Sequence, residues 1–153
     1  MKVAEALIIR SDYQKRVEHI KNRLVQNVRV QEGDQPNEEP AVLMRELTEL
    51  LNHLKDLIQN INKTNLVTAF DEGQTLADAL TKRDLIGKER KIYSDLLEEA
   101  TMRHDRYSRT EIKNVTTINV KETQKYVDKL SMTYRRLDMK IQELNWKTDL
   151  VES

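Results

Sequence analysis

Apolar residues recur along the second quarter of the chain at alternating intervals of four and three, which is the 3.5-residue period of a coiled coil. The members of this seam are Leu43, Leu47, Leu50, Leu54, Leu57 and Ile61. The same period returns near the C-terminus in Val127, Leu130, Tyr134, Leu137, Ile141 and Leu144, and more briefly near the N-terminus in Tyr13, Val17, Ile20 and Leu24. The sequence therefore predicts that helices pack against helices.

Segments with helical spacing alternate with turn-forming and β-branched segments. We expect helices over about residues 3–28, 41–62, 76–104 and 121–145, and short strands over about residues 28–31, 66–70 and 112–118. The predicted fold is mainly α, with one helical domain over residues 1–153. It is arranged as an up-down four-helix bundle or as antiparallel coiled-coil hairpins, with a small β element.

The third predicted helix carries two apolar stripes. One register contains Leu76, Ala79, Ile86, Tyr93, Leu97 and Ala100. The same register places Arg83 and Arg90 at core-type positions, while Leu85, Ile92 and Leu96 form a neighbouring stripe. Two interpretations stay open: the arginines set the register at a cost in stability, or the helix packs on two sides.

Charge and composition limit the classes of partner. The chain has 26 basic and 26 acidic side chains, so its net charge gives no bulk attraction to nucleic acid or to an anionic membrane. Charged residues make up 34% of the chain, and it has one Phe and one Trp, which indicates a thin core. Cysteine is absent, which excludes disulfides and thiolate chemistry. We therefore expect a homo-oligomer, and we expect neither nucleic acid nor a membrane as its partner.

The apolar runs are short. The run at residues 6–9 is shorter than the apolar core of a signal peptide, and no run approaches the ~20 apolar residues of a membrane span. We expect a soluble, cytoplasmic protein.

The sequence contains no recognisable catalytic or cofactor motif. His19, His53 and His104 lie on different predicted helices, and none has the Glu-x-x-His spacing of di-metal carboxylate bundles. Glu49 and His53 are four residues apart, a spacing that suits two metal ligands but also an ordinary solvated pair, which we expect here. We predict that the protein is not an enzyme and uses no cofactor or metal. The sequence does not indicate a particular small-molecule ligand.

A basic cluster lies where the third helix gives way to a predicted strand. It comprises Arg103, Arg106, Arg109 and Lys113, with Tyr107 among them. We expect these residues to pair with the acidic loop at residues 31–40, within one subunit or between subunits. The alternative is an anion or RNA site in which Tyr107 stacks on a base.

A second group of polar residues is predicted to meet at the other end of the bundle. The group comprises Asn62, Asn65, Arg83, Asp84 and Trp146. Helix ends need polar side chains for their unpaired N–H and C=O groups, which accounts for most of this group. The functional alternative is a ligand pocket lined by the five residues.

Four blocks of the sequence resemble those of the septicolysin-like family of small, mostly uncharacterised bacterial proteins. They are INKTN at 61–65, Thr75-Leu76 with Ala79-Leu80 and Arg83-Asp84, RYSRTEIK at 106–113, and NWKTDL at 145–150. Residues 4–8 and 30–33 are similar to the family as well. The resemblance implies an association with a haemolysin, from which the family takes its name, and it implies no catalytic or binding residues.

These observations favour a non-enzymatic, self-associating helical protein that acts as a structural or interaction module, since coiled-coil seams usually pair with partners. Two alternatives stay open. One is a membrane-active, lysin-like protein, and the other is an RNA- or anion-binding helical hairpin.

Overall fold

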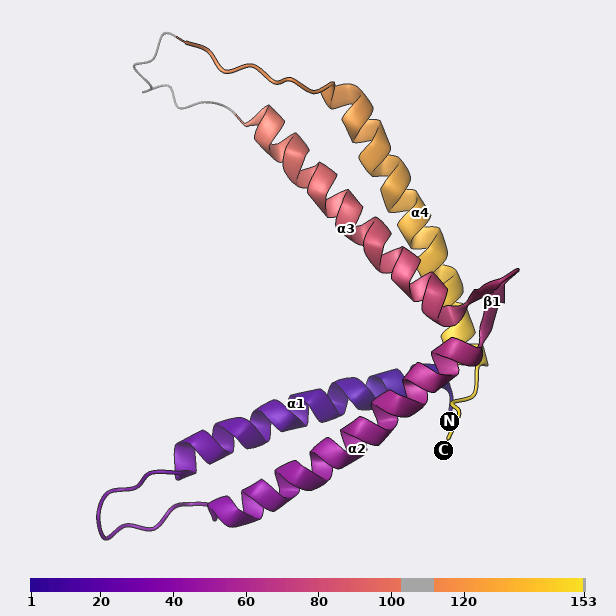
Figure 1. Ribbon diagram of the computed structural model, residues 1–153. Helices are drawn as coiled ribbons and strands as arrows, with labels where there is room; N and C mark the ends of the chain where they lie inside the picture. The colour runs from indigo at the N-terminus through magenta and orange to yellow at the C-terminus, as the bar shows by residue number, and fades with distance from the viewer. Residues whose placement is uncertain (103–111, 153) are drawn as a thin grey trace. The chain divides into compact units, whose positions relative to one another are not determined.

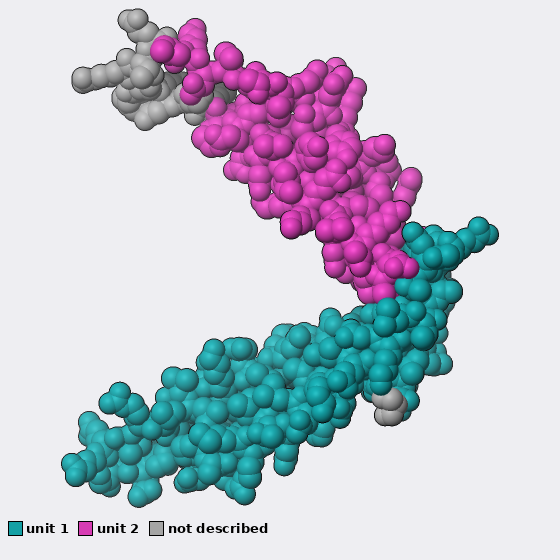
Figure 2. All heavy atoms as spheres, in the orientation of Figure 1, with its two compact units in different colours: residues 1–76, 143–153 teal, residues 77–142 magenta. Residues whose placement is uncertain are grey.

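The computed structural model describes residues 1–102 and 112–152. Along the chain it contains α1 (Val3–Asn27), α2 (Pro40–Val67), β1 (Ala69–Asp71), β2 (Gln74–Thr75), α3 (Leu76–Thr101) and α4 (Val120–Lys147) (Figure 1). The elements divide between two compact units: residues 1–76 with 143–153 form unit 1, and residues 77–142 form unit 2 (Figure 2). The prediction of a mainly α fold with antiparallel helices and a small β element is confirmed. The prediction of a single domain stays a prediction.

Unit 1 is built on the antiparallel pair of α1 and α2 (Figure 1). The predicted seam of α2 provides its buried side, because Leu43, Leu50 and Ile61 are buried. From α1 the buried residues are Val3, Ala4, Ala6, Ile20 and Asn27. The helix α2 begins at Pro40, where the missing N–H would have no partner in any case. One stripe of each helix therefore holds the pair together.

The two ends of the chain meet in unit 1. The N–H of Val3 donates to the carbonyl of Thr148 at 2.9 Å, and the N–H of Leu150 donates to the carbonyl of Met1 at 2.8 Å. Leu150 joins a small core with Ala6 and Ile61. The segment that follows α4 thus closes the apolar end of the α1–α2 pair.

A short β hairpin follows α2. Ala69 pairs with Thr75 across two antiparallel strands, and Gly73 supplies a positive φ of 72° in the turn between them. The predicted strand at 66–70 is wrong in its first residues, because Leu66 and Val67 extend α2. The N–H of Thr68 donates to the carbonyl of Thr64 at 3.0 Å, so the helical hydrogen bonding continues through these two residues despite their local β propensity.

Unit 2 contains most of α3 and α4, which lie side by side (Figure 1). The rings of Tyr93 and Tyr126 meet edge to face with centroids 5.0 Å apart. A Cβ atom added at Gly87 would lie 3.0 Å from the ring of Tyr134, so the glycine permits a close approach of α4. Ile141 is fully buried. The C-terminal seam therefore supplies α4 with its packing side.

Two predicted strands are wrong. Residues 28–31 form no strand and belong to the connection between α1 and α2, where Val28 is 59% exposed. Residues 112–118, all of them described, likewise form no strand, and Ile112 is 82% exposed. β-Branched residues favour a strand only where a partner strand and a packing face exist, and neither segment is paired here.

The predicted helix ranges agree with the structure to within five residues at their ends. The helix α2 continues to Val67, five residues beyond its predicted end, α3 ends at Thr101 rather than at residue 104, and α4 covers Val120–Lys147. Within the described residues, no helix has the length and apolar character needed to cross a membrane.

Replacing Ile61 with Ala should lower the free energy of unfolding by about 2–5 kcal/mol, because it leaves a cavity at the closed end of unit 1. Urea denaturation followed by circular dichroism measures this change. The matched control is Leu66→Ala on the same helix, since Leu66 is 64% exposed and should change stability by less than about 0.5 kcal/mol. Equal effects of the two substitutions would contradict the assigned packing side of α2.

Candidate functional site

The predicted basic cluster lies mostly outside the described residues. Arg103, Arg106, Tyr107 and Arg109 all fall within residues 103–111. Lys113 is described and is exposed. The anion or RNA site therefore stays a prediction.

The five residues of the predicted polar pocket divide between the two units. Asn62, Asn65 and Trp146 belong to unit 1, and Arg83 and Asp84 belong to unit 2. Asn62 is exposed, Trp146 is 55% exposed, and Asn65 is half-buried with its Oδ1 atom buried and without a hydrogen bond from the described residues. The pocket stays a prediction.

Arg83 has partners on both helices of unit 2. Its Nη1 atom donates to Asp138 Oδ1 at 3.0 Å, and its Nε atom donates to the neighbouring Asp84 at 3.1 Å. Burial alone would lower the pKa of Arg83, but the hydrogen bonds to the two carboxylates raise it. Arg90 lies over the ring of Tyr134, with its guanidinium carbon 5.5 Å from the centroid. The two arginines at core-type positions thus serve the contact between α3 and α4.

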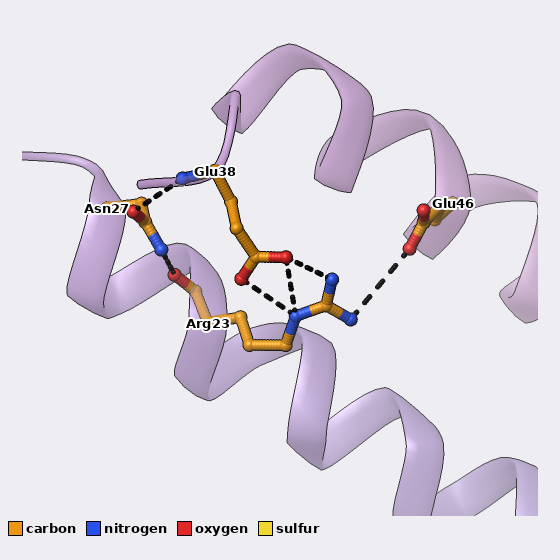
Figure 3. Close-up of polar contacts among 4 residues, drawn as sticks. All are labelled: Arg23, Asn27, Glu38 and Glu46. Atoms are coloured by element: carbon orange, nitrogen blue, oxygen red, sulfur yellow. Dashed lines mark hydrogen bonds and ion pairs between the residues drawn. The ribbon is translucent and has the colours of Figure 1, made fainter. Parts of the chain in front are cut away.

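A group that we name the turn cluster joins the end of α1 to the start of α2 in unit 1 (Figure 3). Its members are Arg23, Asn27, Glu38 and Glu46. The guanidinium of Arg23 donates to both carboxylate oxygens of Glu38, with a distance of 2.9 Å from Nε to Oε2, and it lies 4.0 Å from Glu46. Asn27 accepts the N–H of Glu38 at 3.0 Å and donates to the Arg23 carbonyl at 2.7 Å. The cluster therefore fixes the connection between the two helices.

The ion pair in the turn cluster shifts the titration of both its members. The hydrogen bond from Arg23 lowers the pKa of Glu38, and the same bond raises the pKa of Arg23. Asn27 occupies the next position of the N-terminal seam after Leu24, so a polar residue among apolar ones was the signal from which the cluster could have been predicted. Its partner Glu38 could not have been predicted, because the path of the connection between α1 and α2 brings Glu38 to Asn27.

A groove of about 370 Å³ runs between α1 and α2 beside the turn cluster. Its lining residues are Arg16, His19, Ile20, Arg23, Glu46, Glu49, Leu50 and His53. The buried side chains of Ile20 and Leu50 line it, with both arginines on α1 and both carboxylates on α2. Glu49 and His53 thus lie at one groove, but within the described residues no three His, Cys, Asp or Glu side chains are grouped to hold a metal ion. The arrangement suits attraction between the two helices.

One apolar surface on α3 is exposed to solvent, and we name it the outer stripe. It comprises Leu85, Ile92 and Leu96, which are 59%, 51% and 48% exposed. On the same helix Ala79 and Leu97 are buried. The helix therefore has apolar residues on two sides, one packed within the chain and one exposed to solvent.

These features define a class: a mainly α protein of paired helices with an exposed apolar stripe. A family model described as "Family of unknown function (DUF6847)" matches residues 10–150, and the chain belongs to this family. The chain is also similar to a functionally unknown conserved protein from Corynebacterium diphtheriae whose crystal structure is known. The two are 48% identical, the match covers 99% of each chain, and the TM-score is 0.92. None of the curated proteins matches the chain. The resemblance to the septicolysin-like family stays a prediction.

Replacing Glu38 with Gln should destabilise the chain in a pH-dependent manner. Because the pKa of Glu38 is lowered in the folded chain, its stabilising contribution is complete above the ordinary glutamate pKa and is lost as the pH falls through the lowered value. We expect the wild type to have the larger free energy of unfolding at neutral pH and the difference to shrink on acidification. Urea denaturation at a series of pH values measures both quantities.

The matched control is Glu32→Gln, since Glu32 is exposed in the same connection between α1 and α2. This variant should follow the wild type at every pH. A difference between the wild type and Glu38→Gln that is the same at all pH values would mean that the charge of Glu38 is not what stabilises the turn.

Proposed function

We propose that this chain is a non-enzymatic, self-associating helical protein with a structural or interaction role. The observation that carries the proposal is the outer stripe, in which three large apolar side chains are about half exposed on one face of α3. Apolar side chains gathered on one surface favour association, because contact with another apolar surface removes them from water.

The charge balance is compatible with the same proposal. Arg23 binds Glu38 within unit 1, and Arg83 binds Asp138 within unit 2, so these side chains contribute to the pairing of helices. The net charge of zero also means that two copies do not repel one another as a whole.

The solution mass of the full chain tests the proposal. Size-exclusion chromatography with light scattering, over a range of protein and salt concentrations, should give a multiple of the 18.0 kDa chain mass. The assembly should persist at high salt, because apolar contacts are not screened as exposed ion pairs are. A mass of 18.0 kDa at every concentration would contradict self-association.

A further inference from the structure

We infer that the outer stripe of one copy pairs antiparallel with the outer stripe of a second copy, an inference that rests on the proposed function. The stripe has the spacing that such a contact requires. Leu85 and Ile92 are seven residues apart and Leu96 follows four residues later, so the three side chains share one helical face.

This face lies beside the contact with α4, since Glu89 on the same side of α3 accepts a hydrogen bond from the hydroxyl of Tyr126 on α4. Ile92 is two residues from Arg90, which at 3.6 residues per turn is about 200° around the helix. Arg90 lies over the ring of Tyr134 on α4, and Leu97, about 140° from Ile92, is buried. The three stripe side chains are about half exposed and so are open to a partner, and at the C-terminal end of the stripe Leu96 and Glu99 line a hollow with residues 114–118 of the same chain.

The charges beside the stripe select the partner and its direction. Lys82 and Lys88 lie toward the N-terminal end of the stripe, and Asp95 and Glu99 lie toward its C-terminal end. An antiparallel pair places the basic end of one copy opposite the acidic end of the other, whereas a parallel pair places like charges together. Asp95 is also bonded to Lys91 of its own helix, so Lys82 and Glu99 are the pair that favours a two-fold contact between identical chains.

One register pairs the two leucines of the stripe and one of the opposite-charge pairs. When Leu85 faces Leu96 of the second copy, Lys82 faces Glu99, and the two Ile92 side chains lie near the two-fold axis. This arrangement places the three apolar side chains within the contact, with Glu89 of one copy opposite Ile92 of the other and a Lys82–Glu99 pair at each end.

Cross-linking of full-length variants tests the arrangement. The chain has no cysteine, so Lys82→Cys and Glu99→Cys each introduce a unique thiol. The two variants are mixed at a dilution that lets copies exchange, concentrated, and treated with a short bismaleimide. In the proposed pair the two thiols lie on helices about 8–10 Å apart. Two identical thiols would be separated by about 26 Å along the helix axis, at 1.5 Å per residue.

We expect a covalent dimer from the mixture and none from either variant alone. Adding Leu85→Gln and Leu96→Gln to both variants should abolish the dimer, because the apolar contacts of the stripe are lost. Adding Met139→Gln should leave its yield unchanged, since Met139 is 70% exposed on α4 of the same unit.

Other results would overturn the inference in distinguishable ways. Efficient cross-linking of either variant with itself would mean a parallel pair. If no cross-link forms in a sample whose mass is a multiple of 18.0 kDa, the chain self-associates through a surface other than the outer stripe. A mass of 18.0 kDa under all conditions would contradict both the contact and the proposed function.

Discussion

A pair of helices can bury only one stripe of each member, and this limit governs how the present chain is stabilised. In unit 1 the seam of α2 packs with α1, and the closed end is completed by Leu150 against Ala6 and Ile61. The hydroxyl of the buried Thr64 accepts the N–H of Val151 at 2.8 Å, which ties the C-terminal segment to α2. The apolar contacts bury these side chains, and hydrogen bonds to the backbone and to the Thr64 hydroxyl hold the two ends of the chain in place.

Polar contacts add to the small apolar seams in holding the helices together. The turn cluster holds the connection between α1 and α2 through the contacts of Arg23 and Asn27 with Glu38. In unit 2 the bond between Arg83 and Asp138 joins α3 to α4. Both groups lie at positions where a seam includes a polar residue in place of an apolar one. We interpret them as structural contacts that determine which helices pair and in which register.

The sequence predicted the helices well because the 3.5-residue seams directly reflect which side of each helix is buried, as Leu43, Ile61 and Ile141 illustrate. It failed at residues 28–31 and 112–118, where β-branched residues without a partner strand remain irregular. The stripe of Leu85, Ile92 and Leu96 was visible from spacing alone, but its exposure required the structure. Asn27 at a seam position was a signal for the turn cluster, but the partners of Asn27 and the groove could not be predicted, because they depend on which residues of α1, α2 and their connection come to lie opposite one another.

The central claim is that α3 uses one apolar side within the chain and the other to bind a second copy. Hydroxyl-radical footprinting of the wild-type chain measures it directly, since it reports the solvent accessibility of individual side chains. Concentrating the protein should lower the oxidation of Leu85, Ile92 and Leu96 and leave that of the exposed Leu66 and Met139 unchanged. Unchanged oxidation of the three stripe residues in a sample that has associated would contradict the claim.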